Sequence, residues 1–347
     1  MFFLVSNLGF CLKFLAFPPT KKSIKSPFSS PILINLFVGR GEDMKNKKNL
    51  QPFVSVVMPV YNAGDFLVEA IESILKQTYK NFEFIIVDDA STDNSWKILK
   101  KYRKKDKRIR IYKIEENVGV SQTVKFAIEK SNGNFLARMD ADDIAHPQRL
   151  EKEVNYLLKN SQTVAVGTQC LLINKDGKTI GKKIFPTKFE DIYRYIFTFI
   201  PVQQPTLMIN KTKLPKDFEY YYDSMDTAEE MELLFKLFQY GKVENINEKL
   251  HYYRLHDKNT SLINLKKTFL LTLLSRIKAI FKYKYSPTLS GFLFTLAQSV
   301  LILLLPSQWI LFLYKKIRKM GKSKELIKKK IYPVLRIAFR LFLIFFK

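Results

Sequence analysis

Residues 82–93, FEFIIVDDASTD, contain the pattern that decides the fold. The first six residues form an apolar run with the length and composition of a buried β-strand. Asp88 and Asp89 end this run, and residues 91–93 supply polar side chains that commonly cap a helix, here one that continues to about Tyr102. A strand that passes through an acidic turn into a helix indicates the βα unit of a parallel sheet.

The same alternation surrounds this segment on both sides. Short apolar runs alternate with stretches in which apolar residues recur every three or four positions. We therefore expect an α/β fold with a mostly parallel central sheet flanked by helices. The predicted strands are Val54–Val60, Phe82–Val87, Ile109–Ile114 and Asn134–Met139, and the predicted helices are Asp65–Gln77, residues 91–102, Gly119–Lys130 and one that opens at Pro147.

The pattern becomes less regular after residue 163. The turn sequence Asn174-Lys175-Asp176-Gly177 predicts a hairpin between two strands, and Gly241 ends a well-defined amphipathic helix. These features predict an irregular second half of the same domain. Its expected elements are the strands Val164–Ile173, Thr179–Ile184, Thr206–Ile209 and Val243–Asn247 and the helices Glu190–Phe199 and Thr227–Tyr240.

The net charge of +26 is concentrated at the two ends of the chain. Residues 262–347 hold 18 Lys or Arg and one acid, which gives +17, and residues 1–50 hold 8 Lys or Arg and 2 acids, which gives +6. Residues 51–261 are therefore nearly neutral, at +3. The basic excess lies among Phe, Leu and Ile, which favours an anionic lipid surface over nucleic acid, and no RNA-binding motif accompanies it.

Composition divides the chain into three parts. Residues 1–52 are an apolar segment and a linker, and residues 53–261 form the predicted globular domain. Residues 262–347 form a basic and apolar helical region for membrane association. Translation can start at Met1 or at Met44, because both are methionines ahead of the regular pattern.

The last part predicts membrane attachment but leaves its form open. Leu262–Tyr285 is a candidate basic amphipathic helix, and Ser286–Tyr314 contains no charged residue. The second segment is long enough to cross a bilayer, which needs about 20 apolar residues. Ile331–Lys347 favours attachment in the plane of the interface instead. In both cases the Lys and Arg excess predicts the cytoplasmic face of a membrane.

Two acidic loops follow strands of the predicted parallel sheet. One is Asp88-Asp89, and the other is Asp140-Ala141-Asp142-Asp143. Ligands of open α/β sheets bind at the carboxyl ends of the strands, so both loops face the same crevice. A carboxylate loop can bind a diphosphate through Mg²⁺ or Mn²⁺, whose preferred ligands are oxygens. The alternative is structural, because each loop taken alone is also compatible with a solvated turn or a helix cap.

The chain resembles family 2 glycosyltransferases over residues 53–261. The resemblance implies a GT-A fold, a nucleotide-diphosphate sugar donor, most commonly a UDP-sugar, and inversion at the anomeric carbon. It also implies a saccharide or lipid-linked acceptor in the assembly of surface polysaccharide or glycolipid. The motifs that carry the resemblance are residues 54–62 (VSVVMPVYN), 77–79 (QTY), 86–93 (IVDDASTD), 117–121 (NVGVS) and 138–143 (RMDADD) followed by 147–150 (PQRL).

This resemblance assigns roles to individual residues of the crevice. Asp89 would contact the base or the ribose, and Asp140 would lie near the ribose and the metal. The metal ligands would be Asp142 and Asp143, and Arg138 belongs to the same donor-binding segment. The nucleotide pocket would be lined by Pro59, Tyr61 and Asn62.

Inversion in a single displacement needs a base for the acceptor hydroxyl. The family supplies it from a Glu-Asp pair at a helix start, and this chain has Glu229-Glu230, so Glu230 stands in for the usual aspartate. The alternative for Glu230 is an acidic first helical turn that stabilises the helix dipole. His256 is a candidate ligand for the metal or phosphate, or a structural histidine. Residues 203–206 (QQPT) resemble a segment on the acceptor side.

Two other classes of protein remain as alternatives. A sugar nucleotidyltransferase also combines an α/β sheet with a divalent metal, but it would normally need an early glycine-rich phosphate loop. Residues 62–64 (NAG) are the only candidate for such a loop. The other alternative is a membrane-bound pseudo-enzyme that binds nucleotide sugars without catalysis, which the unusual Glu230 leaves open.

Overall fold

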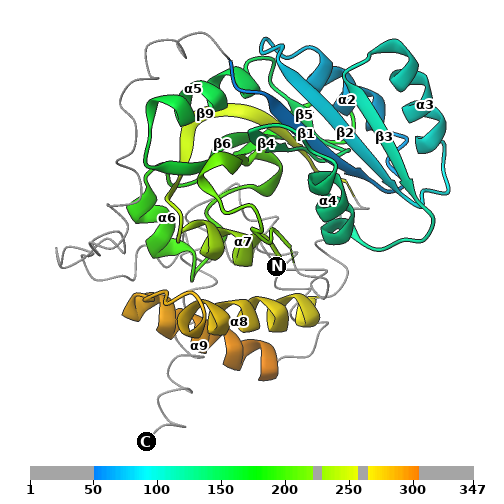
Figure 1. Cartoon of the computed structure of the whole chain (residues 1–347). Helices are drawn as coiled ribbons and strands as arrows, with labels where there is room; N and C mark the ends of the chain where they lie inside the picture. Colours follow the sequence, from blue (N-terminus) through cyan, green and yellow to red (C-terminus); the bar gives the residue numbers. More distant parts are fainter. Residues whose placement is uncertain (1–50, 222–228, 257–264, 305–347) are drawn as a thin grey trace, which may run out of the picture.

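The computed structural model describes residues 51–221, 229–256 and 265–304, and Figure 1 shows their arrangement. Four parallel strands form the first half of the central sheet in the order β3-β2-β1-β4. Their bounds are β1 (Val54–Val60), β2 (Phe82–Asp89), β3 (Ile109–Ile114) and β4 (Phe135–Arg138), as the sequence predicts to within two residues. The prediction of a parallel α/β core is therefore confirmed for this half.

The second half of the sheet is mixed. The order continues β8-β6-β9-β5, with β7 paired to β6, and only the β6–β9 pair is parallel. The bounds are β5 (Ile144–Ala145), β6 (Thr163–Ile173), β7 (Thr179–Lys183), β8 (Met208–Asn210) and β9 (Lys242–Arg254). The predicted hairpin is confirmed. The predicted strand Val243–Asn247 is too short, because β9 continues for seven more residues.

Helices cover both faces of the sheet because side chains alternate along its strands. Met58 and Val60 face a core with α2 (Leu67–Leu75), α3 (Ser95–Lys105) and α5 (Arg149–Lys159). Val57 faces the opposite core with α4 (Val120–Glu129), α6 (Phe189–Tyr195) and α7 (Glu229–Leu237). The sequence prediction of helices on both faces is thus confirmed.

Helix α5 starts at Arg149, not at Pro147 as predicted. The buried side chain of Gln77 explains this start. Its Nε2 donates to the carbonyl of His146 at 2.8 Å, and its Oε1 accepts from the amide of Leu150 at 2.9 Å. Gln77, which lies two residues after α2, therefore satisfies an amide in the first turn of α5 and joins two helices on one face of the sheet.

The C-terminal helices α8 (Leu265–Phe281) and α9 (Leu289–Leu304) lie beside α7, on its side away from the sheet (Figure 1). Tyr285 stacks on Phe197 with ring centroids 5.0 Å apart and packs edge-on against Phe235 at 4.9 Å. Within the described residues, no helix has both the length and the apolar character needed to cross a membrane. The predicted apolar segments at residues 305–314 and 331–347 lie outside the described residues.

Candidate active site

The loops after β1 and β2 are tied together at the carboxyl end of the sheet. Asn62 has a positive φ of 49°, and its Oδ1 accepts from the amides of Thr92 at 2.8 Å and Asp93 at 3.3 Å. Its own amide donates to Ser91 Oγ at 3.0 Å. The two loops therefore form one rigid wall, and the ring of Tyr61 remains 54% exposed beside it. This wall contains the predicted nucleotide-pocket residues Tyr61 and Asn62, and Pro59 lies just before it in β1.

Asp89 orders the loop that leads into α4. Its two carboxylate oxygens accept from the amides of Val118 at 2.9 Å and Gly119 at 3.0 Å. Gly119 has a φ of 86°, which suits glycine, and it precedes the first turn of α4. The carboxylate thus neutralises the positive end of that helix. The predicted contact of Asp89 with the donor base or ribose stays a prediction.

The acidic loop lies between β4 and the short strand β5. Asp140, Asp142 and Asp143 each offer a carboxylate oxygen, and these three atoms lie within 4.8 Å of one another. The pairing of β5 with β9 brings the loop next to residues more than 100 positions later in the chain, with Ala145 opposite His251. Sheet register therefore places strand β9 beside the three carboxylates.

Asp143 is the buried member of this group. Its Oδ2 lies 2.7 Å from His251 Nε2, and its Oδ1 accepts from the amide of Arg254 at 2.8 Å. Burial holds the pKa of His251 well below its usual range, which favours the neutral ring at this contact. The Asp143 side chain is 1% exposed, whereas Asp140 and Asp142 are 30% and 28% exposed. Asp140 and Asp142 are therefore the more accessible ligands.

Asp142 and Asp140 each have a basic neighbour. His256 Nε2 lies 2.9 Å from Asp142 Oδ2, and the His256 ring packs on Phe66 at 4.9 Å. Arg138 Nη2 lies 2.9 Å from Asp140 Oδ1. The structure thus brings His256 and Arg138 to the acidic loop, as the sequence predicts, but their ligand and donor-binding roles stay predictions.

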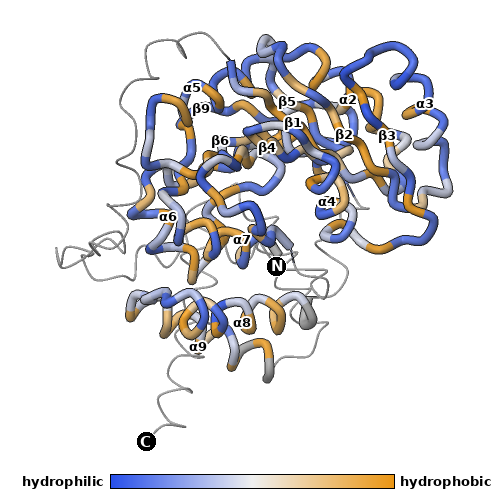
Figure 2. The backbone as a smooth tube through the Cα atoms, in the orientation of Figure 1, coloured by the Kyte–Doolittle hydropathy of each residue, from blue (hydrophilic) through white to orange (hydrophobic). Residues whose placement is uncertain are grey.

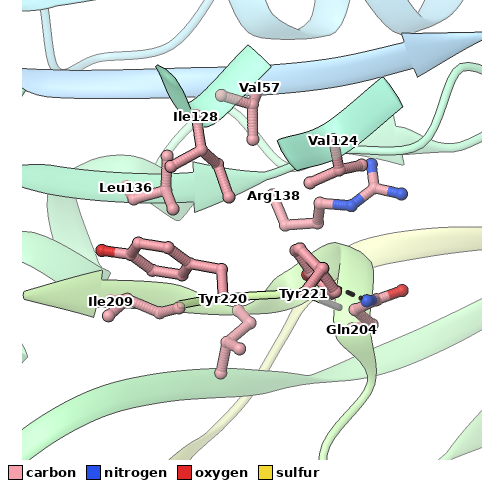
Figure 3. Close-up of a pocket in the computed structure, with 10 residues that line it drawn as sticks. Val57, Val124, Ile128, Leu136, Arg138, Gln204, Ile209, Tyr220 and Tyr221 are labelled. Atoms are coloured by element: carbon pink, nitrogen blue, oxygen red, sulfur yellow. Dashed lines mark hydrogen bonds between the residues drawn. The ribbon is translucent and has the colours of Figure 1, made fainter. Parts of the chain in front are cut away.

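The stem of Arg138 also lines a small apolar cavity beneath the site (Figure 3). In this cavity Gln204 Nε2 donates to the hydroxyl of Tyr221 at 3.1 Å. Arg138 therefore spans from an apolar interior to an acidic surface. The rest of the lining comes from strands β1, β4 and β8, from helix α4 and from the segments before β8 and α7. The other lining residues are Val57, Val124, Ile128, Leu136, Leu207, Ile209 and Tyr220.

The charge balance of the loop fits a divalent cation. Burial and repulsion from Asp142 raise the pKa of Asp140, and the positive charge of Arg138 partly opposes this rise. Burial and repulsion from the other two aspartates also raise the pKa of Asp143 well above its usual range. The ligands are all carboxylate oxygens, which Mg²⁺ and Mn²⁺ prefer, and a cation would relieve this repulsion.

Glu230 lies at the start of α7, and its charge interacts with that of Asp140 in the loop. Burial raises its pKa to about 7, and the negative charge of Asp140 contributes to the rise. Lys183 and Arg138 act in the opposite direction. The Glu230 carboxylate is therefore coupled electrostatically to the acidic loop. A carboxylate with a pKa near neutrality suits a general base.

Three residues of the site escape the sequence prediction: His251, Tyr253 and Lys183. Lys183 Nζ lies 4.0 Å from the centroid of the Tyr253 ring and donates to Gln203 Oε1 at 2.8 Å. Burial and the charges of Asp143, Asp142, Asp140 and Glu230 raise the pKa of Tyr253 well above its usual range. Tyr253 therefore lies among the acids, with Lys183 as their counter-charge. The only sequence signal for Tyr253 is its place three residues before the candidate ligand His256.

Comparisons with known proteins agree with this fold and site. The model of "Glycosyl transferase family 2" matches residues 55–216. An uncharacterised glycosyltransferase of Haemophilus influenzae is 33% identical over 227 residues, which cover 61% of this chain and 68% of that protein. The O-antigen biosynthesis glycosyltransferase WbnJ of Escherichia coli is 33% identical over 216 residues, covering 60% and 81%. The chain belongs to glycosyltransferase family 2 and is a glycosyltransferase, which sets aside the nucleotidyltransferase and pseudo-enzyme alternatives.

Solved structures share the fold at lower identity. TarS of S. aureus, solved with UDP-GlcNAc, is 20% identical with a TM-score of 0.55, and the match covers 65% of this chain and 66% of that one. The mannosyltransferase PcManGT of Pyrobaculum calidifontis, solved with GDP-Man and Mn²⁺, is 14% identical with a TM-score of 0.51, covering 84% and 86%. These likenesses support the GT-A fold.

Proposed function

We propose that this glycosyltransferase moves a sugar from a nucleotide-diphosphate donor to a saccharide or lipid-linked acceptor, with inversion and with a divalent metal. The observation that carries the proposal is the convergence of Asp140, Asp142 and Asp143 within 4.8 Å at the strand ends. Glu230 has a pKa raised to about 7, in part by the negative charge of Asp140. The site thus combines a leaving-group end with a base for the acceptor hydroxyl.

The residues of the site have separate proposed roles at the leaving-group end and at the acceptor end. Asp140 and Asp142, supported by Asp143, would hold Mg²⁺ or Mn²⁺, and His256 stands beside Asp142 as a further candidate ligand. When bound, the cation supplies charge stabilisation to the departing diphosphate. Glu230 takes the proton from the acceptor hydroxyl as that oxygen attacks the anomeric carbon.

The nucleotide would lie along the wall formed by the loops after β1 and β2. Tyr61 is exposed enough to stack on a base, and Asn62 fixes the loop that presents it. UDP is the favoured nucleotide because it is the commonest donor in the family; among the structures that share the fold, TarS was solved with UDP-GlcNAc and PcManGT with GDP-Man. The relative WbnJ, an O-antigen enzyme, supports a place in surface polysaccharide assembly.

A screen of nucleotide sugars tests the proposal. Purified protein is heated with UDP-, GDP- and dTDP-sugars in the presence of Mn²⁺, Mg²⁺ or chelator. We expect one sugar nucleotide to raise the melting temperature only when the metal is present. The anomeric configuration of the transfer product, read by NMR, then tests inversion. Retention of configuration, or stabilisation by no sugar nucleotide, would contradict the proposal.

A further inference from the structure

Helix α8 has an outward face made of apolar side chains. Leu270, Leu274, Ile277 and Phe281 are 50%, 51%, 44% and 80% exposed. Their spacing of four, three and four residues places them in one stripe along the helix. They are also the exposed residues of α8 whose side chains the structure describes. A helix on a water-facing surface normally carries polar and charged side chains there.

Helix α9 extends the same apolar surface. Leu289, Phe292 and Leu293 are 74%, 49% and 46% exposed, and α9 contains no charged residue. Figure 2 shows hydrophobic stretches on both helices, at the edge of the molecule below α7. We call the seven exposed side chains on these two helices the α8–α9 face.

Among the α8 side chains that the structure describes, the polar ones are buried or contact a neighbouring helix. Lys278 Nζ lies 3.5 Å from Glu232 Oε2 in α7, and the Lys278 side chain remains 43% exposed. Arg276 is 1% exposed and donates from Nη1 to Thr295 Oγ1 at 3.2 Å and to Gln298 Oε1 at 3.0 Å in α9. The described part of α8 thus presents hydrocarbon to the outside and turns the charge of Arg276 toward α9.

The charge around the α8–α9 face indicates what covers it. Lys282 and Lys284 are exposed directly after Phe281, at the edge of the face. The sequence that follows α9, residues 305–347, holds twelve Lys or Arg and one acid, Glu325. A second copy would bring +17 from residues 262–347 against an equal charge, whereas anionic lipid would neutralise it.

We propose that the α8–α9 face docks on an anionic lipid bilayer, with its apolar side chains among the acyl chains and its lysines at the headgroups. This inference does not depend on the identity of the donor or on the metal. It has a structural consequence for the site, because Glu232 accepts from Tyr283 Oη at 2.7 Å and lies two residues after Glu230. Docking would therefore fix the orientation of α7 and its base relative to the membrane.

The test uses the full-length protein and sedimentation with vesicles of phosphatidylcholine and phosphatidylglycerol. We expect the double variant Leu274→Glu/Ile277→Glu to lose vesicle affinity by about tenfold or more, since two charges would enter the acyl region. Leu158→Glu is the matched control: Leu158 is 57% exposed on α5, across the molecule from α8 (Figure 1), and the variant should bind like the wild type.

Three results would overturn the proposal. The first is wild-type vesicle binding by Leu274→Glu/Ile277→Glu. The second is equal binding of the wild type to vesicles without phosphatidylglycerol. The third is a double variant that changes from dimer to monomer by light scattering while vesicle binding is unchanged, which would mean that a second copy covers the face. The variant Leu274→Ser/Ile277→Ser repeats the test without added charge, and circular dichroism verifies that each protein is folded.

Discussion

Glu230 is the residue on which the chemistry of acceptor activation depends. Its carboxylate interacts with Asp140, Lys183 and Arg138, so it belongs to the acidic site and not merely to the first turn of a helix. A base must be deprotonated to act. Because the pKa of Glu230 is raised to about 7, turnover should fall as the pH drops through 7.

Glu230→Gln should lower kcat by about 10²- to 10⁴-fold while donor affinity is retained, because the amide cannot accept the proton. Single-turnover kinetics and donor titration measure the two quantities separately. Glu190→Gln, another acid in a first helical turn, controls for loss of a helix-dipole interaction and should remain active. Unchanged turnover in Glu230→Gln would assign the base to another residue.

The positive charge of Lys183 affects the pKa of the proposed base Glu230. This charge lowers the pKa of Glu230, so Lys183→Met should raise that pKa and move the acid limb of the kcat profile to higher pH. Lys183→Arg should keep the profile close to that of the wild type. The neighbouring Lys182 is exposed, and Lys182→Met should leave the limb in place. A limb that stays fixed, or moves to lower pH, in Lys183→Met would refute this coupling.

The sequence predicts the acids of the site but not their partners, for a reason that lies in the sheet register. Asp140, Asp142 and Asp143 follow a strand directly, so local pattern is enough to find them. Lys183 lies opposite Cys170 in the β6–β7 pair, and Cys170 lies opposite His251 in the β6–β9 pair. Only this long-range pairing brings the lysine to the acidic loop, and its own segment resembles a solvated hairpin.

At the scale of elements, α5 supports the strand end that carries the site. Arg149 is fully buried; its Nε donates to Glu153 Oε1 at 2.9 Å and its Nη2 donates to the carbonyl of Arg138 at 2.8 Å. Burial raises the pKa of Glu153 to about 7, although Arg149 opposes the rise. The pair therefore ties a helix to the end of β4, next to Asp140.

Arg149→Ala should lower the free energy of unfolding by about 3–5 kcal/mol, because it leaves buried polar groups without a partner. The double variant Arg149→Met/Glu153→Leu should recover much of that loss, since apolar side chains of similar volume replace the pair. Urea denaturation measures both. Equal destabilisation of the single and double variants would show that packing, and not the uncompensated charge, is the cause.

The same pair predicts how stability depends on pH. The pKa of Glu153 is higher in the folded protein than its ordinary value of 4.5, so the folded state holds the proton more tightly. The contribution of Glu153 to the free energy of unfolding should therefore decrease as the pH rises from about 4.5 to 7. Urea denaturation across this range should show a smaller decrease for Glu153→Gln. An identical pH dependence in the wild type and the variant would contradict the assignment.

Strand β9 shows why the second half of the sheet is hard to predict. The polar residues Glu248 and Lys249 interrupt its apolar pattern, and the β6–β9 pairing shifts register near Gln169. Beyond the interruption, His251 and Arg254 are fully buried, because they bind Asp143 and Asp142. Burial normally marks apolar residues, so a strand that buries polar side chains for the sake of a site does not show the usual alternation.

At the scale of the whole molecule, the C-terminal helices belong partly to the catalytic core. Ala279 is fully buried and Tyr285 nearly so, in the same cluster as α4, α6 and α7. A chain that ends at Tyr285 should therefore fold and be stabilised by the donor, whereas one that ends at Ser261 should lose much of its soluble yield and its cooperative melting. Equal melting of both truncated chains would show that α8 is dispensable for the fold.

The central claim is that the acidic loop holds the metal at the leaving-group end of a glycosyltransferase site. Its most direct test is donor turnover by Asp142→Asn with and without Mn²⁺, since Asp142 is an accessible carboxylate of the group. Asp176→Asn, in the exposed β6–β7 turn, is the matched control. We predict metal-dependent turnover in the wild type and the control and its loss in folded Asp142→Asn. Full turnover in Asp142→Asn, or in the wild type with chelator, would contradict the claim.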